Sequence, residues 1–178
     1  MYLRRSLGRK SSEENRPYKE KELRYILLQT ASALVAAHSK SLTHKDLKPS
    51  DIYQAGKHCK LGNFGRFLLQ PKFLTSPVDC YMSSQQWQAC LHGSLYNAFK
   101  ADVFALRAAL LHMVTLTSPA ILLSSMALNE AVDREIGTLA CSELLKSLLR
   151  SLLAYEEDRR PTMHEICSVL SKVSIPSH

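Results

Sequence analysis

Glycine and proline are scarce in this chain. Among 178 residues there are six glycines and seven prolines. Collagen-like and low-complexity chains are far richer in both, and an all-β architecture with many turns needs more of them. An apolar fraction of 46% with a charged fraction of 22% also excludes a mostly disordered chain. We therefore expect a single folded domain over residues 1–178, since this length fits one domain and is short for two.

Paired cysteines are also lacking. The five cysteines contain no C-x-x-C pair, and their number is odd. No apolar stretch follows the first basic residues, so a secretion signal is not indicated. These features favour free thiols in a reducing compartment over a disulfide framework or a zinc site. The expected location is the cytoplasm.

Formal charge is absent from one stretch long enough to cross a bilayer, residues 108–128. Polar side chains interrupt it, and the run Thr117-Ser118-Pro119 is typical of a helix end, because the residue before proline avoids the α region. A helix that is apolar on all sides is what the centre of a domain requires. We therefore predict a buried helix over residues 100–115 followed by a loop, and no membrane span.

Helical periodicity is the commonest pattern elsewhere. Apolar residues have helical spacing over residues 18–40, after Ser142 and after Thr162, where Glu165 completes a capping-box pattern. Short runs around Ala55-Gly56 suggest a small hairpin, and residues 75–97 look polar and irregular. The predicted core positions are Leu23, Ile26, Leu27, Ala31, Leu34, Val35 and His38 in the first helix, Leu144, Leu145, Leu148, Leu149, Leu152 and Leu153 in the second, and Ile166, Val169, Leu170 and Val173 in the third.

Basic residues outnumber acidic ones, 23 to 16, which gives a net charge of +7. Several lie in residues 1–17, which we expect to form a basic arm or short helix before a main body at 18–173 and a tail at 174–178. Such clusters are usually solvated, and aromatic residues do not alternate with these charges as in many nucleic-acid-binding segments. No nucleic-acid partner is expected, and a basic adaptor for acidic surfaces is the third of three hypotheses.

Two irregular segments carry residues suited to catalysis. Residues 44–51 read H-K-D-L-K-P-S-D, and residues 61–65 read L-G-N-F-G. They resemble the catalytic loop and the metal-binding loop of eukaryotic protein kinases, H-R-D-L-K-P-x-N and D-F-G. Three more runs resemble later kinase motifs in the same order: Y-M-S-S-Q at 81–85, A-D-V-F-A-L at 101–106 and E-E-D-R-R-P-T at 156–162. A single match would be weak, but five in order across residues 20–173 are strongly indicative.

The resemblance implies a mainly α fold, the C-terminal lobe of a protein kinase with a small β-hairpin in the catalytic-loop region. It places Met1 near the hinge, so the N-lobe with its Gly-rich loop and its ATP-contacting lysine is expected to be absent. The run L-G-R-K-S at residues 7–11 lacks the first glycine and the spacing of a phosphate-binding P-loop. The segment before His44 looks most like NIMA-related (Nek) serine/threonine kinases.

The resemblance also gives roles to single residues. Asp46 would orient the substrate hydroxyl, and Lys48 would neutralise the transferring γ-phosphate. Asp51 and Asn63 stand at the positions that bind magnesium and ATP, where the family has Asn and Asp, respectively. A neutral amide at the second position is a weaker ligand for a hard cation. We therefore expect weak metal binding at most and no cofactor, with Mg²⁺ and ATP as the alternative.

Seven further positions are expected to be structural: His44, Lys45, Phe64, Gly65, Gln85, Asp102 and Arg160. Asp102 would anchor the catalytic-loop backbone. Lys45 replaces the usual arginine and can act only as a point charge. Gln85 replaces a glutamate that pairs with the arginine matched by Arg160, so an ion pair becomes a charged–neutral hydrogen bond.

Two other departures from the family pattern bear on the site. Val78, in the run Pro77-Val78-Asp79, replaces a threonine whose hydroxyl would contact Asp46 and Lys48. Arg107 stands where the central helix usually has glycine, and a cation there must extend to solvent or find a carboxylate.

These departures favour a catalytically inactive, pseudokinase-like binding or scaffold protein. A protein partner would then cover the apolar surface that an N-lobe normally occupies. The alternative is a weakly active serine/threonine kinase, or one completed by an N-lobe from another chain, because Asp46 and Lys48 are both present.

Overall fold

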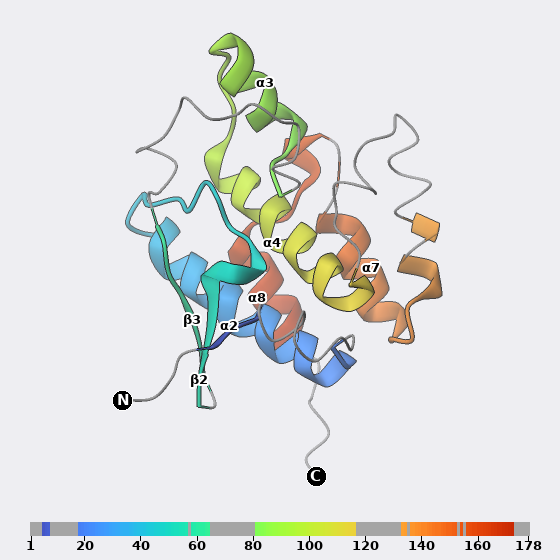
Figure 1. Ribbon diagram of the computed structural model, residues 1–178. Coiled ribbons are helices and arrows are strands. Elements are labelled where there is room, and N and C mark those ends of the chain that lie inside the picture. The colour runs from blue at the N-terminus through green and yellow to red at the C-terminus, as the bar shows by residue number, and fades with distance from the viewer. Residues whose placement is uncertain are drawn as a thin grey trace.

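The computed structural model describes residues 5–7, 18–56, 58–64, 81–116, 133–134, 136–152, 154 and 156–172. The helices are α2 (Glu20–His38), α3 (Ser84–His92), α4 (Ala98–Thr115), α7 (Glu143–Leu152) and α8 (Met163–Lys172), the strands are β1 (Arg5–Ser6), β2 (Ile52–Ala55) and β3 (His58–Leu61), and two short 3₁₀ turns are η1 (Pro49–Asp51) and η3 (Glu157–Arg159). Helices surround α4, and the strands lie beside α2 (Figure 1). The mainly α prediction is confirmed.

Helix α4 forms the centre of the described fold. It is buried from Ala101 through Leu111 and again at Met113, and it packs against α2, α3 and α7. Asn97 caps its start by accepting hydrogen bonds from two backbone amides. The helix ends at Thr115, and Leu116 follows in a left-handed conformation with φ of 57°. The predicted buried helix is thus confirmed to within two residues at its start.

No helix in the described part of the chain is long and apolar enough to cross a membrane.

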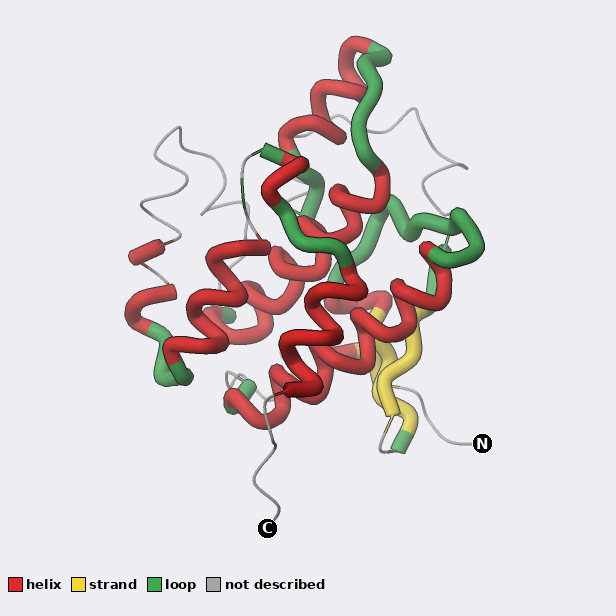
Figure 2. The backbone as a smooth tube through the Cα atoms, turned by 180° about the vertical axis from the view of Figure 1, so that it is seen from behind, coloured by secondary structure: helices red, strands yellow, loops and turns green. Residues whose placement is uncertain are grey.

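The predicted hairpin is present and belongs to a three-stranded antiparallel sheet. Strands β2 and β3 pair from Ile52 opposite Leu61 to Ala55 opposite His58, and Gly56 at the turn has φ of +63°. Strand β1 pairs with the other edge of β2. Residues 5–6 are therefore a strand, where the sequence suggested an arm or short helix. The free edge of a hairpin offers unpaired backbone groups, and these two residues satisfy some of them. All three strands lie at one edge of the helices (Figure 2).

The helical stripes are mostly confirmed. The predicted positions of α2 are buried except Val35 and His38, which are half-buried. The prediction that Leu144 and Val169 are core residues is wrong, because their side chains are 43% and 39% exposed. Each lies at the margin of a stripe whose centre is buried, at Leu145, Leu148, Leu149 and Leu152 in α7 and at Ile166 and Leu170 in α8. Leu153 and Val173 lie outside the described residues.

The largest error of the sequence interpretation concerns α3. This helix lies within residues 75–97, which were expected to be irregular. Its helix is defined by its ends, because the Ser83 hydroxyl accepts a hydrogen bond from the Gln86 amide over 3.2 Å and Gly93 adopts a left-handed conformation. Gln86 is its one fully buried residue. A helix with so little apolar burial has no stripe for a periodicity analysis to detect.

The predicted capping box at the start of α8 is confirmed. The Thr162 amide donates to Glu165 Oε2 over 2.6 Å, and the Glu165 amide donates to Thr162 Oγ1 over 3.2 Å. Ser142 caps α7 in a similar way, by accepting a hydrogen bond from the Leu145 amide over 3.3 Å.

Candidate functional site

One buried carboxylate holds the first loop against α4. Asp102 is fully buried, and its two oxygens accept hydrogen bonds from the backbone amides of His44 and Lys45, each over 2.8 Å. His38 Nε2 donates to the same carboxylate over 2.9 Å. Lys45 has φ of +69°, which is rare for a residue with a side chain. The anchor therefore holds a strained backbone directly before Asp46, in the arrangement that the kinase resemblance implies.

His44 joins the first loop to the second. Its side chain is fully buried, and Nε2 donates to the Gly62 carbonyl over 2.8 Å. Its ring centroid lies 4.7 Å from that of Phe64. The other ring nitrogen has no hydrogen-bond partner among the described residues. The ring thus positions the backbone next to Asn63 and is not exposed for proton transfer.

Asp46 and Lys48 lie close together at the surface. Lys48 Nζ donates to Asp46 Oδ2 over 3.1 Å, and both side chains are partly exposed. An exposed ion pair of this kind contributes only about 0–1 kcal/mol to stability. Both groups can therefore reorient toward a bound molecule at little cost.

Asp51 and Asn63 are bonded directly to each other. The Asn63 amide nitrogen donates to Asp51 Oδ1 over 2.6 Å, and Asp51 is only 1% exposed. Asp51 Oδ2 is buried and has no hydrogen-bond partner among the described residues. Asn63 adopts φ of +61°, and its amide nitrogen also lies 3.5 Å from the Tyr53 hydroxyl. The amide therefore presents a donor, not its oxygen, to the carboxylate.

This pair is poorly suited to a divalent cation. Magnesium requires near-ideal octahedral geometry and oxygen ligands. Here the two positions supply one carboxylate, and one of its oxygens is already bonded to an N–H donor. No cluster of three or more His, Cys, Asp or Glu side chains that could hold a metal occurs among the described residues. Asp51 Oδ2, which has no hydrogen-bond partner among the described residues, could supply one anionic ligand. A cation bound by both Asp51 and Asn63 would require the hydrogen bond between their side chains to break.

Arg160 bonds to Gln85 as the sequence predicts for a charged–neutral pair. One guanidinium nitrogen donates to Gln85 Oε1 and another to the Ala154 carbonyl, each over 2.8 Å. The guanidinium carbon lies 5.1 Å from the centre of the Phe104 ring. Burial lowers the pKa of Arg160 to about 10, and the nearby Glu157 opposes this shift. Carbonyl oxygens and a π face are thus among the groups that satisfy the cation.

Gln86 is a site residue that the sequence reasoning missed. It is buried, and its Nε2 donates to the Lys45 carbonyl over 2.7 Å. It connects α3 to the catalytic-loop backbone at the strained position. A glutamine in an apparently irregular segment gives no signal of this role, and only the Ser83 cap could have placed it on a helix.

Arg107 departs from expectation in a different way. It neither reaches solvent nor finds a carboxylate, because its side chain is fully buried and its three guanidinium nitrogens have no hydrogen-bond partner among the described residues. Burial lowers its pKa well below the usual value, with Asp133 opposing this and Arg150 adding to it. Asp133 is itself paired with Arg150, over 3.5 Å. The glycine-to-arginine difference therefore places in the core a guanidinium that has no hydrogen-bond partner in the part of the chain that the structure describes.

The remaining predicted positions are only partly described. Phe64 is 41% exposed although its ring packs against that of His44 at an interplanar angle of 48°. Gly65 and Val78 lie outside the described residues. Within the segment 75–97, the Tyr81 hydroxyl lies 2.6 Å from His112 Nδ1, which ties this segment to α4. Burial lowers the pKa of His112.

Comparison with known proteins gives the same family. The protein kinase domain family matches residues 2–170. A Wee1-like protein kinase of Arabidopsis thaliana is 29% identical over 151 residues, which cover 83% of this chain and 29% of that protein. Sperm motility kinase Z of Mus musculus is 29% identical over 169 residues, covering 88% of this chain and 32% of its own length. This chain therefore spans only about a third of such relatives. With the anchored loop, the hairpin and the ordered motifs, these matches show that the chain belongs to the protein kinase domain family.

Proposed function

We propose that this chain is a catalytically inactive, pseudokinase-like module that acts by binding another protein. The observation that carries the proposal is the hydrogen bond between Asn63 and Asp51. Phosphoryl transfer depends on metal ions that bridge the phosphates and neutralise developing charge. Where the family has a metal-bridging carboxylate, this chain has an amide whose nitrogen is bound to the other position.

Two other residues near this pair hold the surface formed by the two loops. Asp102 and His44 hold the two loops in place through buried hydrogen bonds. Phe64, at 41% exposure, adds an apolar side chain beside the more polar Asp46 and Lys48. A fixed surface with an exposed aromatic side chain and a polar rim is typical of a protein-binding site. The proposed partner is a protein that covers this face, where the family's N-lobe would lie.

A weakly active serine/threonine kinase is the second candidate. It is favoured by the presence of Asp46 and Lys48, whose charged atoms Oδ2 and Nζ lie 3.1 Å apart. Asp51 Oδ2, with no partner, would be the first ligand for a metal in that case. The closeness to NIMA-related kinases, the cytoplasmic location and the basic-adaptor hypothesis stay predictions from the sequence.

The test is nucleotide binding by the purified chain, measured as the shift in thermal unfolding with ATP in the presence and absence of Mg²⁺. We expect no Mg²⁺-dependent shift. The control is Asp51→Ala, which should behave like the parent chain toward Mg²⁺ and ATP. A Mg²⁺-dependent stabilisation of the parent that Asp51→Ala abolishes would refute the proposal and favour the weakly active kinase.

A further inference from the structure

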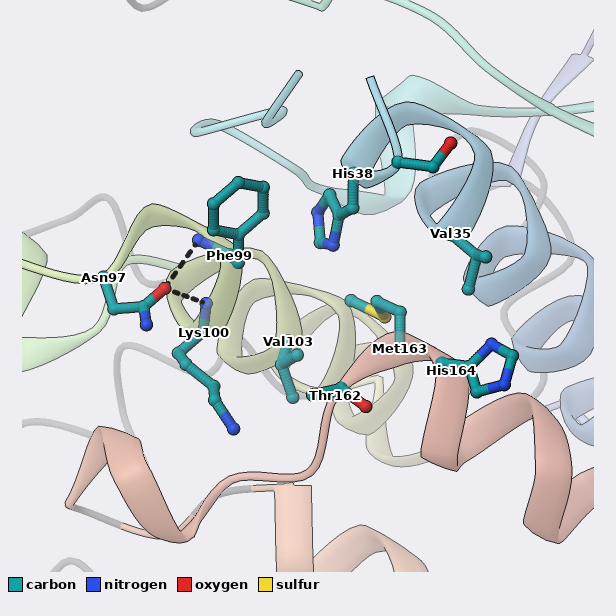
Figure 3. A pocket seen from close by; sticks show the side chains of 10 residues that line it. Val35, His38, Asn97, Phe99, Lys100, Val103, Thr162, Met163 and His164 are labelled. Carbon is teal, nitrogen blue, oxygen red and sulfur yellow. Dashed lines mark hydrogen bonds between the residues drawn. The ribbon is translucent and has the colours of Figure 1, made fainter. Parts of the chain in front are cut away.

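A pocket of about 420 Å³ lies away from the two loops, where three helix ends meet. It is formed by the last turn of α2, the first turns of α4 and the start of α8 (Figure 3). Figure 3 shows His38, Val103 and Met163 pointing toward the same space from these three helices. The volume is within the range of about 300–1,000 Å³ that small-molecule sites occupy. Neither the kinase motifs nor the proposed function accounts for this pocket.

The walls of the pocket are mainly apolar and aromatic. Val35, Val103 and Met163 line it, and Phe99 lies at its margin with 40% of its surface exposed. The Phe99 ring meets His38 edge to face, with centroids 5.0 Å apart and an angle of 80°. An aromatic ligand fits such walls, because its ring can meet the edges of other rings and the sulfur of a methionine.

The polar groups around the pocket favour an anion. Lys100 lines the pocket, and its ammonium group donates to the Arg160 carbonyl. Hydrogen bonds from Thr162 lower the pKa of the nearby Glu165 carboxyl group, and the charge of Lys100 adds to this effect. His38 and His164 also line the pocket. Three carboxylates lie against lining residues, and each is already engaged: Asp102 by His38 and two loop amides, Glu165 by Thr162, and Glu157 by the Asn97 backbone amide.

Asn97 and Thr162 line the pocket at the starts of α4 and α8, and each start already holds a carboxylate of the chain, Glu157 at Asn97 and Glu165 at Thr162. Asn97 Oδ1 is used by two α4 amides, which leaves its amide nitrogen available to donate. The donors that remain beside the apolar cavity are therefore the Lys100 ammonium group and the side-chain amide of Asn97.

We propose that this pocket binds a small aromatic molecule carrying one carboxylate. The ring would occupy the space between Phe99 and Met163, and the carboxylate would face Lys100. This site does not depend on the proposed loss of catalysis, since it uses none of the residues of the two loops.

The pocket is connected to the catalytic loop through one side chain. His38 lines the pocket and also donates to Asp102, which accepts the amides of His44 and Lys45. A ligand that covers His38 removes water that competes for its hydrogen bond. Occupancy should therefore stabilise the loop backbone at Lys45, although the ligand does not touch it.

The test uses 2-naphthylacetate and, as a neutral probe of similar shape, 2-(2-naphthyl)ethanol, with binding measured by titration calorimetry. We expect saturable binding with a preference for the carboxylate of roughly tenfold, a difference of about 1.4 kcal/mol. Lys100→Met keeps the stem of the side chain and should remove most of that preference. Equal binding of the two probes by the parent chain would overturn the assigned ligand class.

The location is tested by filling the pocket. Val35→Trp, at a half-buried position on α2, should abolish binding, whereas Val169→Trp, on the exposed side of α8, should leave it unchanged. Absence of saturable binding by the folded parent chain, or binding that survives Val35→Trp, would overturn the site. Hydrogen exchange at the His44 and Lys45 amides should slow on binding, and unchanged exchange at saturation would overturn the connection to the loop.

Discussion

Asn63 donates its side-chain amide to the Asp51 carboxylate over 2.6 Å, so the two positions that should share a metal are bonded to each other. The family places Asn first and Asp second, and the summed charge of the swapped pair is the same. Its geometry is not equivalent, because Asp51 is a buried residue at the end of η1 while Asn63 is exposed. The single carboxylate is therefore at the less accessible of the two positions.

Asn63→Asp is expected to destabilise the chain by about 1–3 kcal/mol without metal, because a hydrogen bond is replaced by two adjacent carboxylates and a buried acceptor is left unpaired. Adding Mg²⁺ should restore part of the lost stability. The measurement is urea unfolding with and without MgCl₂. The double variant Asp51→Asn with Asn63→Asp is the control, since it keeps one amide and one carboxylate and should lose less stability. Full stability of the single variant without metal would contradict the geometry of the pair.

Arg107→Met is expected to raise stability by about 1–4 kcal/mol, because a buried guanidinium without a hydrogen-bond partner among the described residues is replaced by an apolar side chain of similar length. Thermal or urea unfolding measures the change. Arg150→Met provides a matched control: Arg150 is partly exposed and paired with Asp133, so its loss should change stability by only about 0–1 kcal/mol. A clear loss of stability in Arg107→Met would mean that the guanidinium has a favourable partner.

Asp102→Asn is expected to lower stability by about 1–3 kcal/mol, because the amide retains one acceptor oxygen while three donors compete for it. The His44 and Lys45 amides should exchange faster with solvent than in the parent chain. Asp46→Asn changes the same atoms at a partly exposed position and should leave both stability and exchange nearly unchanged. Equal exchange in the two variants would show that Asp102 is not the anchor of the loop.

The capping box of α8 predicts a dependence of stability on pH. Hydrogen bonds from Thr162 to the Glu165 carboxylate hold the pKa of Glu165 below its usual value of 4.5. Because the folded-state pKa is depressed, the contribution of this carboxylate is complete above pH 4.5 and is lost as the pH falls through the lower folded-state value. Glu165→Gln can still accept the hydrogen bonds but cannot titrate. The difference in stability between the parent and Glu165→Gln should shrink as the pH falls below 4.5, and a constant difference would contradict the assignment.

The sequence correctly predicted the helices and strands that are marked by apolar periodicity, by capping residues or by a turn glycine. Helices α2, α4, α7 and α8 have apolar stripes or caps, and the hairpin has a glycine between two short β-prone runs. Helix α3, which the sequence did not predict, depends on a serine cap and buries a glutamine, so its stabilisation is local and polar. Apolar periodicity does not report such a helix.

For the site, the ordered motifs indicated the residue types but not their bonding. That Asp51 and Asn63 would be bonded to each other depends on the left-handed backbone at Asn63, which no residue pattern specifies. The same holds for Gln86, whose bond to the Lys45 carbonyl needs α3 to be a helix. The pocket at His38 combines residues from three helices and depends on how those helices pack.

The central claim is that the family's chemistry is lost while its loop scaffold is retained. Its most direct test is the transfer of labelled phosphate from Mg-ATP to the chain itself and to a general serine/threonine protein substrate, with Asp46→Ala as the reference. The account predicts no transfer above that of Asp46→Ala in either case. Transfer by the parent chain that requires Mg²⁺ and disappears in Asp46→Ala would contradict it.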